Sequence, residues 1–281
     1  MNRPLTVAAG VVLALTAGLR AAPPAPPTGS APRGAPARLL ELVNNERRSR
    51  GVTPLTWSAD LARLAGRHAE DMQRAGRLSH LSAGDHADYP DRLIAADLPA
   101  LTAAENIARG ADADDAHRGL MASAGHRRNI LNPALEHIGI GVSRDPARRA
   151  IWFCQDFATL IPRLADREAD RRLRHALTGA WQAAGGSLRE DRQLSDTLRR
   201  ALDRMVDEDQ LNTSFIAVPG PTWVYAYTTP KPTDLPGDVL SRAGLTPGFG
   251  ATIRFARTPS TPLGLYWVAI ALTGKSNPPA R

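Results

Sequence analysis

Two histidines and one glutamate are the residues of this chain best suited to joint chemistry. His80, Glu105 and His126 are 25 and 21 residues apart. Two neutral imidazoles and a carboxylate can hold Zn²⁺ or a similar divalent ion, with water completing the coordination. The carboxylate can instead orient one imidazole through a hydrogen bond. Local zinc motifs place their ligands a few residues apart, so at this spacing distant elements must bring the three side chains together.

Short motifs surround these residues in a fixed order. They are Ser79-His80-Leu81-Ser82, Ala104-Glu105-Asn106-Ile107-Ala108, Gly125-His126-Arg127, Ile138-Gly139-Ile140-Gly141-Val142 and Trp152-Phe153-Cys154-Gln155-Asp156-Phe157. In this order and spacing, residues 38–160 resemble the CAP superfamily of cysteine-rich secretory, antigen 5 and pathogenesis-related 1 proteins, in its bacterial secreted, SCP-like branch. The resemblance implies an α+β fold, a three-layer α-β-α sandwich with a central cleft.

The resemblance also implies roles for individual positions. His80 and His126 match the two histidines of the family's site, and Glu105 matches the acid of its Glu-Asn-Ile motif. A divalent metal, Zn²⁺ or another, is therefore expected at these three residues, and no other cofactor. Ser123 stands at the family's second acidic position, and Gln155 at a position near the cleft floor, so both are expected to line the cleft. The other histidines of this segment are interpreted as lying outside the site: His68, His86, His117 and His137.

Three functions stay open on the sequence. Covalent hydrolysis needs a nucleophile beside a base, and neither Ser79 nor Ser123 has an obvious third partner. This favours a binding module over an enzyme, with a lipid, sterol or cell-wall component as the ligand, since lipid binding is associated with some members of the resembled family. The first alternative is an extracytoplasmic metal-dependent hydrolase with Glu105 as its base. The second is a cell-envelope interaction protein that acts through its C-terminal domain.

Arginine dominates the charge of the chain. The formal net charge is +7, and only Lys231 and Lys275 are lysines. The arginines are spread rather than clustered and accompany no nucleic-acid-binding module, so we expect no nucleic-acid partner. Codon bias explains such a composition, and attraction to anionic cell-wall polymers or lipid head groups is its functional alternative.

The first 37 residues are typical of an exported protein. Arg3, the apolar run 5–19 and the small residues at 21–22 predict a signal peptide over residues 1–22. Because that run is too short for a comfortable membrane span, we expect a mature protein without a stable span, in the periplasm or outside the cell. Residues 23–37 are rich in proline and predict an extended linker.

Hydrophobic periodicity predicts the elements that position the motifs. A helix is expected from about Leu39 to Gly51, and a second one after a Ser58 cap. Residues 81–102 are interpreted as loop-rich, and 112–121 as a short helix. Two strands are expected at 138–143 and 151–157, the second holding Cys154, the single cysteine, as a buried apolar residue that forms no intramolecular disulfide.

The second half of the chain repeats part of this pattern. Leu55, Leu61 and Met72 recur 133 residues later, Ile140 recurs as Ile253 and Trp152 as Trp267. The segment that holds His80, Glu105 and His126 has no counterpart there. Residues 161–281 are therefore interpreted as a degenerate CAP-like repeat without the site. Coincidence between two α+β regions of similar composition is the alternative.

Overall fold

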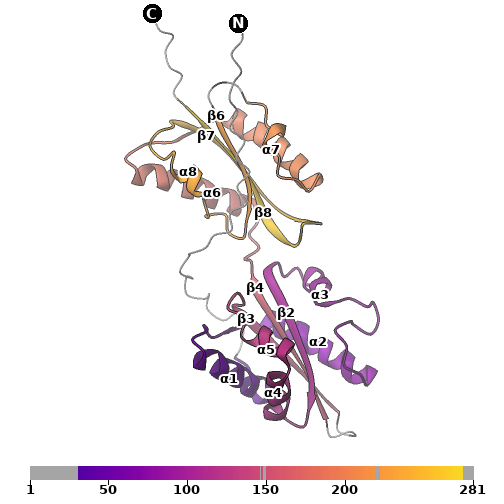
Figure 1. Ribbon diagram of the computed structural model, residues 1–281. Coiled ribbons are helices and arrows are strands. Elements are labelled where there is room, and N and C mark those ends of the chain that lie inside the picture. The colour runs from indigo at the N-terminus through magenta and orange to yellow at the C-terminus, as the bar shows by residue number, and fades with distance from the viewer. Residues whose placement is uncertain (1–30, 146, 148–149, 219, 221, 275–281) are drawn as a thin grey trace, which may run out of the picture. The chain divides into compact units, whose positions relative to one another are not determined.

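The computed structural model describes residues 31–145, 147, 150–218, 220 and 222–274. The expected signal peptide, residues 1–22, lies outside the described residues, as do residues 23–30 of the expected linker. Two compact units form the described chain, with their boundary between Ile161 and Pro162 (Figure 1). Within the described residues, no helix combines the length and the apolar character that a membrane crossing requires.

The first unit contains five helices and four strands among its described residues. They are α1 (Gly34–Ser49), β1 (Thr56–Trp57), α2 (Ala59–Ala75), α3 (Tyr89–Ala95), β2 (Ala100–Gly110), α4 (Ala113–Ala122), α5 (Ala124–Ile130), β3 (His137–Asp145) and β4 (Ala150–Leu160). Residues 34–37 are helical, so the prediction of an extended linker is wrong for them. Pro36 fits there because the first turn of a helix needs no N–H from it.

Helix α2 follows its sequence signals closely. The Ser58 hydroxyl caps it by accepting a hydrogen bond from the Leu61 N–H at 3.3 Å. The helix lies directly against β3, because a Cβ atom at Gly141 would stand 2.1 Å from the Ala65 backbone. Its buried face consists of the residues that periodicity predicts, Leu61, Leu64, Ala65, His68, Ala69 and Met72.

The prediction of a loop-rich segment over residues 81–102 is wrong in two places. Helix α3 lies inside that range, and β2 begins at its end. Asp88 and Asp91 form a reciprocal capping box at the start of α3, with Pro90 in its first turn. The missed strand consists largely of small and polar residues, so period-two hydrophobicity does not reveal it.

The sheet of the first unit forms the middle layer of an α-β-α sandwich. Its strand order is β1-β3-β4-β2, in which β1 pairs parallel with β3 and the other pairs are antiparallel. On one face, Ile107, Trp152 and Cys154 pack in a cluster with α2 residues. On the other, Phe153 and Phe157 pack in the cluster of α1 and α4. Successive residues of β2 and β4 therefore serve opposite layers.

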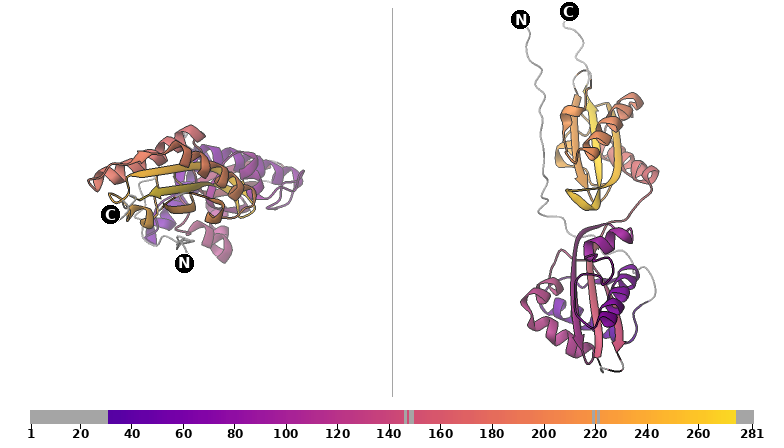
Figure 2. Two further views of the ribbon diagram at one scale, coloured as in Figure 1. Left: turned by 90° about the horizontal axis from the view of Figure 1, so that it is seen from above. Right: turned by 90° about the vertical axis from the view of Figure 1, so that its right-hand side faces the viewer.

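The second unit has the same sheet arrangement. Its elements are α6 (Asp166–Ala183), β5 (Arg189–Glu190), α7 (Arg192–Asp207), the 3₁₀ turn η1 (Thr213–Phe215), β6 (Thr222–Thr229), α8 (Gly237–Leu240), β7 (Gly248–Thr258) and β8 (Thr261–Thr273). The strand order is β5-β7-β8-β6, again with the short first strand parallel to its neighbour. Helices α6 and α7 cover opposite faces of this sheet (Figures 1 and 2).

The pairing registers relate the two sheets residue by residue. Thr56 pairs with His137, and Arg189, 133 residues after Thr56, pairs with Gly248. Ser143 pairs with Trp152, and Arg254 pairs with Trp267. These pairs keep the correspondence of Trp152 with Trp267, but they match Ile140 with Ala251. The sequence match of Ile140 with Ile253 is therefore two residues out of register.

Candidate functional site

Glu105 lies at the centre of a hydrogen-bonded network on the edge strand β2. Its Oε1 accepts a hydrogen bond from His80 Nδ1 at 2.7 Å. Its Oε2 forms an ion pair with the guanidinium of Arg92, which comes from α3. The Cys154 thiol donates to the same Oε2 at 3.4 Å. Glu105 is only 8% exposed, so a buried carboxylate with both oxygens engaged anchors the site.

His80 reaches this carboxylate from the loop that follows α2. Its side chain is 55% exposed, and because Nδ1 contacts Glu105, Nε2 is the ring nitrogen left for an external partner. The loop itself is tied down by Arg92, whose Nη1 donates to the His80 carbonyl at 3.0 Å and the Ala87 carbonyl at 2.9 Å. Arg92 therefore fixes both the backbone of His80 and the carboxylate that orients its ring.

His126 enters the site from the first turn of α5. Its carbonyl accepts a hydrogen bond from Asn106 Nδ2 at 3.1 Å. The same amide donates to Gln155 Oε1 at 3.2 Å, and Asn129 donates to Asn106 Oδ1 at 2.9 Å. Neighbouring residues of a strand point to opposite faces, so Asn106 serves the α5 side and Glu105 the α2 side of β2. His80 and His126 thus belong to segments held on the two faces of one edge strand.

The two residues expected to line the cleft lie in different surroundings. Gln155 is buried beside Asn106, on the face of the sheet opposite to Glu105. Ser123 is half-buried at the junction of α4 and α5, where its side chain makes no capping hydrogen bond. Gln155 supports the backbone of His126 through Asn106, while the hydroxyl of Ser123 stands three residues before His126.

The electrostatics of the two histidines differ. The hydrogen bond to Glu105 raises the pKa of His80 above its usual value. Burial lowers the pKa of His126, and the charge of His80 lowers it further, so the two imidazoles lie within electrostatic reach of each other. Burial opposes ionisation of Glu105, but the hydrogen bond from His80 and the charge of Arg92 outweigh it and lower the pKa of that carboxyl.

A second buried acid, Asp156, lies next to Glu105 on the neighbouring strand. Asp156 stands opposite Glu105 in the β2–β4 pairing and is fully buried, and its Oδ1 lies 3.3 Å from the Cys154 sulfur. Burial and the neighbouring Glu105 raise the pKa of Asp156 well above its usual range, which favours its neutral form. Cys154 is buried as expected, and burial raises the pKa of its thiol, which makes it a poor nucleophile.

Three members of this network are absent from the sequence prediction. His68 was placed outside the site, but it is buried with its Nε2 2.8 Å from the Ser79 carbonyl and 3.7 Å from Glu105. Asp156 and Arg92 have no role in the sequence prediction. The alternation of β4 gives a signal for Asp156, since it shares a face with Trp152 and Cys154. Arg92 carries no local signal among the many arginines of the chain.

The described residues do not gather His80, Glu105 and His126 as one group of potential metal ligands. Among the described residues, the only group of three potential ligands whose atoms lie within 4.8 Å of one another is Glu105, Cys154 and Asp156. That group is buried against the Arg92 cation, which disfavours a second cation there. The Glu105 oxygens already accept hydrogen bonds, so Glu105 suits the orienting role, with His80 and His126 as imidazole ligands. Metal binding at the predicted set stays a prediction.

Comparison with known proteins places this domain in a family. Residues 40–157 match the family model described as "CAP: Cysteine-rich secretory protein family". The match covers the first unit, whose three-layer sandwich is therefore a CAP domain.

The sequence relatives match this domain alone. The "Uncharacterized protein YkwD" of Bacillus subtilis is 35% identical over 118 residues, which are 41% of this chain and 46% of that protein. The "Uncharacterized membrane protein YlbC" of the same organism is 35% identical over 108 residues, 38% of this chain and 31% of that protein. The chain thus covers less than half the length of either relative.

Solved structures match the same part of the chain. An extracellular protein containing an SCP domain from Bacillus anthracis is 29% identical with a TM-score of 0.40, over 43% of this chain and 39% of that one. A cysteine-rich secretory protein from Staphylococcus aureus is 23% identical with a TM-score of 0.37, over 44% and 38%.

Proposed function

We propose that the protein is exported and that its CAP domain is a binding module. The cleft beside His80 and His126 takes a divalent metal, Zn²⁺ or another, and engages a lipid or another cell-envelope ligand. One observation carries this proposal: a buried carboxylate, Glu105, orients the imidazole of a half-exposed histidine and leaves its second nitrogen free. A buried charge network that holds a single exposed ring is typical of a preorganised ligand site.

Each residue of the network has a distinct task in this proposal. Glu105 fixes the ring orientation of His80, and Arg92 fixes the loop and the carboxylate together. Asn106 holds the backbone of His126 from the other face of β2. A bound divalent ion supplies a Lewis-acidic centre for an anionic or carbonyl oxygen of the ligand. With two imidazole ligands from the protein, its affinity is modest, so a ligand oxygen completes the coordination.

Binding is favoured over hydrolysis because the candidate base, Glu105, and the candidate nucleophile, Ser79, are both engaged in other interactions. Glu105 is buried with both oxygens engaged, so it is poorly placed to accept a proton from a substrate or water. The Ser79 hydroxyl donates to the Leu81 carbonyl at 3.0 Å rather than to a histidine. The oriented His80–Glu105 pair favours a metal-dependent hydrolase as the second candidate, with His80 rather than Glu105 exposed to the substrate.

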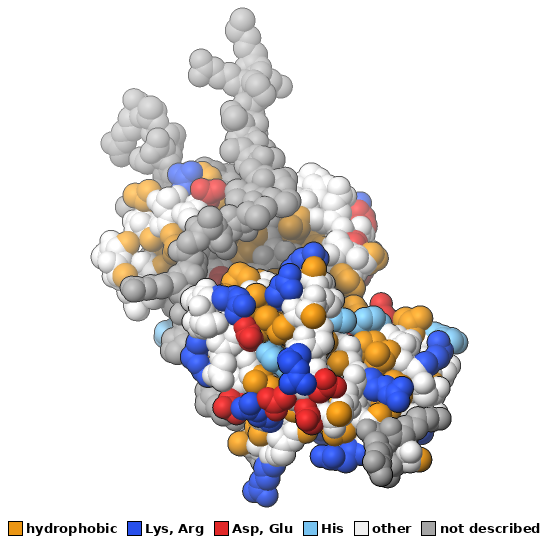
Figure 3. Space-filling view, turned by 60° about the horizontal axis from the view of Figure 1, so that its bottom comes forward, with side chains coloured by type: hydrophobic (Ala, Val, Ile, Leu, Met, Phe, Trp, Pro, Cys, Tyr) orange, Lys and Arg blue, Asp and Glu red, His pale blue; other side chains and the backbone are white. Residues whose placement is uncertain are grey.

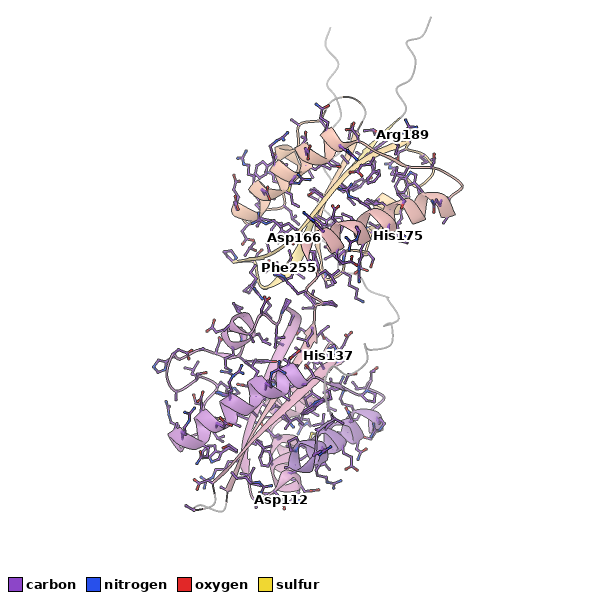
Figure 4. The ribbon with its side chains drawn as sticks, turned by 180° about the vertical axis from the view of Figure 1, so that it is seen from behind. Asp112, His137, Asp166, His175, Arg189 and Phe255 are labelled. Carbon is purple, nitrogen blue, oxygen red and sulfur yellow. The ribbon has the colours of Figure 1, made fainter. Side chains whose placement is uncertain are left out.

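The second unit is proposed as a degenerate CAP-like repeat that has lost the site. The register that matches the two sheets places apolar residues at the network positions: Val224 for Glu105, Ala201 for His68 and Ala271 for Asp156. The described histidine of this unit, His175, is exposed on α6 (Figure 4). Exposed Leu240 and Leu245, at and after α8, are candidates for the partner contacts of the interaction function.

A vesicle flotation assay tests the binding proposal. The full chain, freed of metal by a chelator, is mixed with vesicles of phosphatidylglycerol and phosphatidylcholine, with and without added Zn²⁺. We expect Zn²⁺-dependent flotation that is lost in His126→Ala and retained in His175→Ala, a matched histidine control in the second unit. Flotation that is independent of Zn²⁺ or of His126 contradicts the proposed role of the cleft. Turnover of an ester, peptide or phosphodiester that Glu105→Gln abolishes, with the fold intact, supports the hydrolase instead.

A further inference from the structure

A cavity opens in the CAP domain beside α2. It has a volume of about 900 Å³ and lies between α2, the loop 82–85 and the C-terminal end of α3. It shares Arg92 and His68 with the network around Glu105, while His80, Glu105 and His126 do not line it. Its size falls within the range of small-molecule sites in proteins. The cavity is therefore large enough to hold a ligand of its own.

The lining of this cavity carries charged side chains of both signs in equal number. Three arginines and three acidic residues line it, and they are Arg67, Arg74, Arg92, Glu70, Asp71 and Asp85. Leu64 is its one large apolar residue, and no aromatic side chain takes part. An ion pair joins Arg74 to Asp71, while Arg67 and Glu70 are exposed and form no ion pair with the other described residues. On the face shown in Figure 3, basic and acidic side chains are likewise intermixed.

Two of the lining residues, His68 and Arg92, also carry buried polar atoms without a partner among the described residues. His68 directs Nε2 to the Ser79 carbonyl, which can only accept, so Nε2 carries the proton and Nδ1 is an acceptor. Among the described residues, His68 Nδ1 and Arg92 Nε have no hydrogen-bond partner. One of these atoms accepts and the other donates. Both atoms are enclosed by the protein, so a ligand meets the exposed charged side chains of the lining instead.

We propose that this pocket, defined by Arg67, Glu70, Asp71, Arg74, Asp85 and Arg92, binds a neutral, hydroxyl-rich ligand, a mono- or disaccharide. Side chains of both signs in equal number favour a ligand without net charge that both donates and accepts hydrogen bonds. An isolated phosphate would meet three carboxylates, and a fatty acyl chain would desolvate six charged side chains. The pocket is thus chemically distinct from the metal and lipid site proposed for the cleft.

Saturation-transfer NMR on the full chain tests this proposal. The probes are glucose, N-acetylglucosamine and their β-1,4-linked disaccharides, with inorganic phosphate and palmitate as competing classes. We expect saturable binding of at least one saccharide in the millimolar range. The double variant Arg67→Ala/Glu70→Ala, which changes two exposed side chains of α2, is expected to weaken it at least tenfold. Ala83→Trp, in the exposed loop, is a second variant that crowds the pocket without altering its charges.

Matched variants separate this site from the cleft. Arg63→Ala removes an exposed arginine of the same helix outside the pocket and is expected to leave saccharide binding unchanged. His80→Ala is also expected to leave it unchanged, so failure of the cleft proposal does not affect this one. The proposal is overturned if no saccharide binds saturably, if both pocket variants bind as the wild type does, or if only phosphate or palmitate binds.

Discussion

Replacing Arg92 by methionine should loosen the CAP domain around Glu105. The substitution keeps much of the side-chain volume but leaves a carboxylate that is nine-tenths buried without its ion-pair partner. Removing one member of a buried pair costs about 3–5 kcal/mol, because the other charge stays buried and uncompensated. The His80 and Ala87 carbonyls lose their donors in the same change. We therefore expect a loss of about 3–5 kcal/mol in the free energy of opening of β2 and β4.

Hydrogen exchange measured by mass spectrometry reports this free energy on peptides of β2 and β4, without interference from the second unit. A second substitution identifies the cause. If the buried charge is responsible, adding Glu105→Gln to Arg92→Met should cost little further or recover part of the loss, because the uncompensated charge is then gone. Arg63→Met, which breaks an exposed ion pair on α2, serves as the control and should leave the exchange unchanged. An Arg92→Met effect below about 1 kcal/mol would refute the reasoning.

Three further outcomes follow from the same structure. Gly141→Ala should destabilise the CAP domain by about 1–3 kcal/mol or more, because the added Cβ would stand 2.1 Å from the Ala65 backbone. Thermal unfolding measures this loss, and an unchanged midpoint would contradict the close packing of α2 on β3. Asp156→Asn should become more stable relative to the wild type as the pH rises. A carboxyl whose pKa is raised in the folded protein lowers the stability of the wild type once the pH exceeds the unfolded pKa. Urea unfolding at about pH 4 and about pH 8 measures this, and equal shifts of the midpoint at both pH values would contradict the raised pKa of Asp156. In an NMR titration the pKa of His80 should lie above 6.5 and the pKa of His126 below it. The His80–Glu105 hydrogen bond therefore stabilises the folded protein fully below pH 6.5, and this contribution is lost as the pH rises through the folded pKa of His80. The reverse order of the two pKa values would contradict the hydrogen bond.

The sequence predicts the scaffold of the CAP domain better than its charge network. The face of α2 and its Ser58 cap follow from periodicity and capping chemistry, which are local. Strand β2 is not predicted from the sequence, because alanines and polar residues occupy most of its positions and give no clear hydrophobic alternation. Glu105 lies in the middle of this strand. Family resemblance supplies His80, Glu105 and His126, and the structure brings His80 and Glu105 into contact.

The remaining members of the network are set by tertiary packing. Arg92 reaches Glu105 from a helix that the loop-rich composition conceals, and Asp156 reaches it through the pairing of β2 with β4. Neither relation has a local signature, because both depend on which distant segments become neighbours. The same holds for Arg47, which is fully buried on α1 and donates to the carbonyls of Ile130 at 2.8 Å and Leu135 at 3.0 Å.

The most direct test of the proposed cleft is calorimetric Zn²⁺ titration of the chelator-treated full chain. Wild type is compared with His80→Ala, His126→Ala and the control His175→Ala, each checked for folding. The proposal requires saturable binding in the wild type and the control that is lost in both cleft variants. No binding in the wild type, or equal binding in all four proteins, would contradict it and leave the network around Glu105 as a brace for the fold.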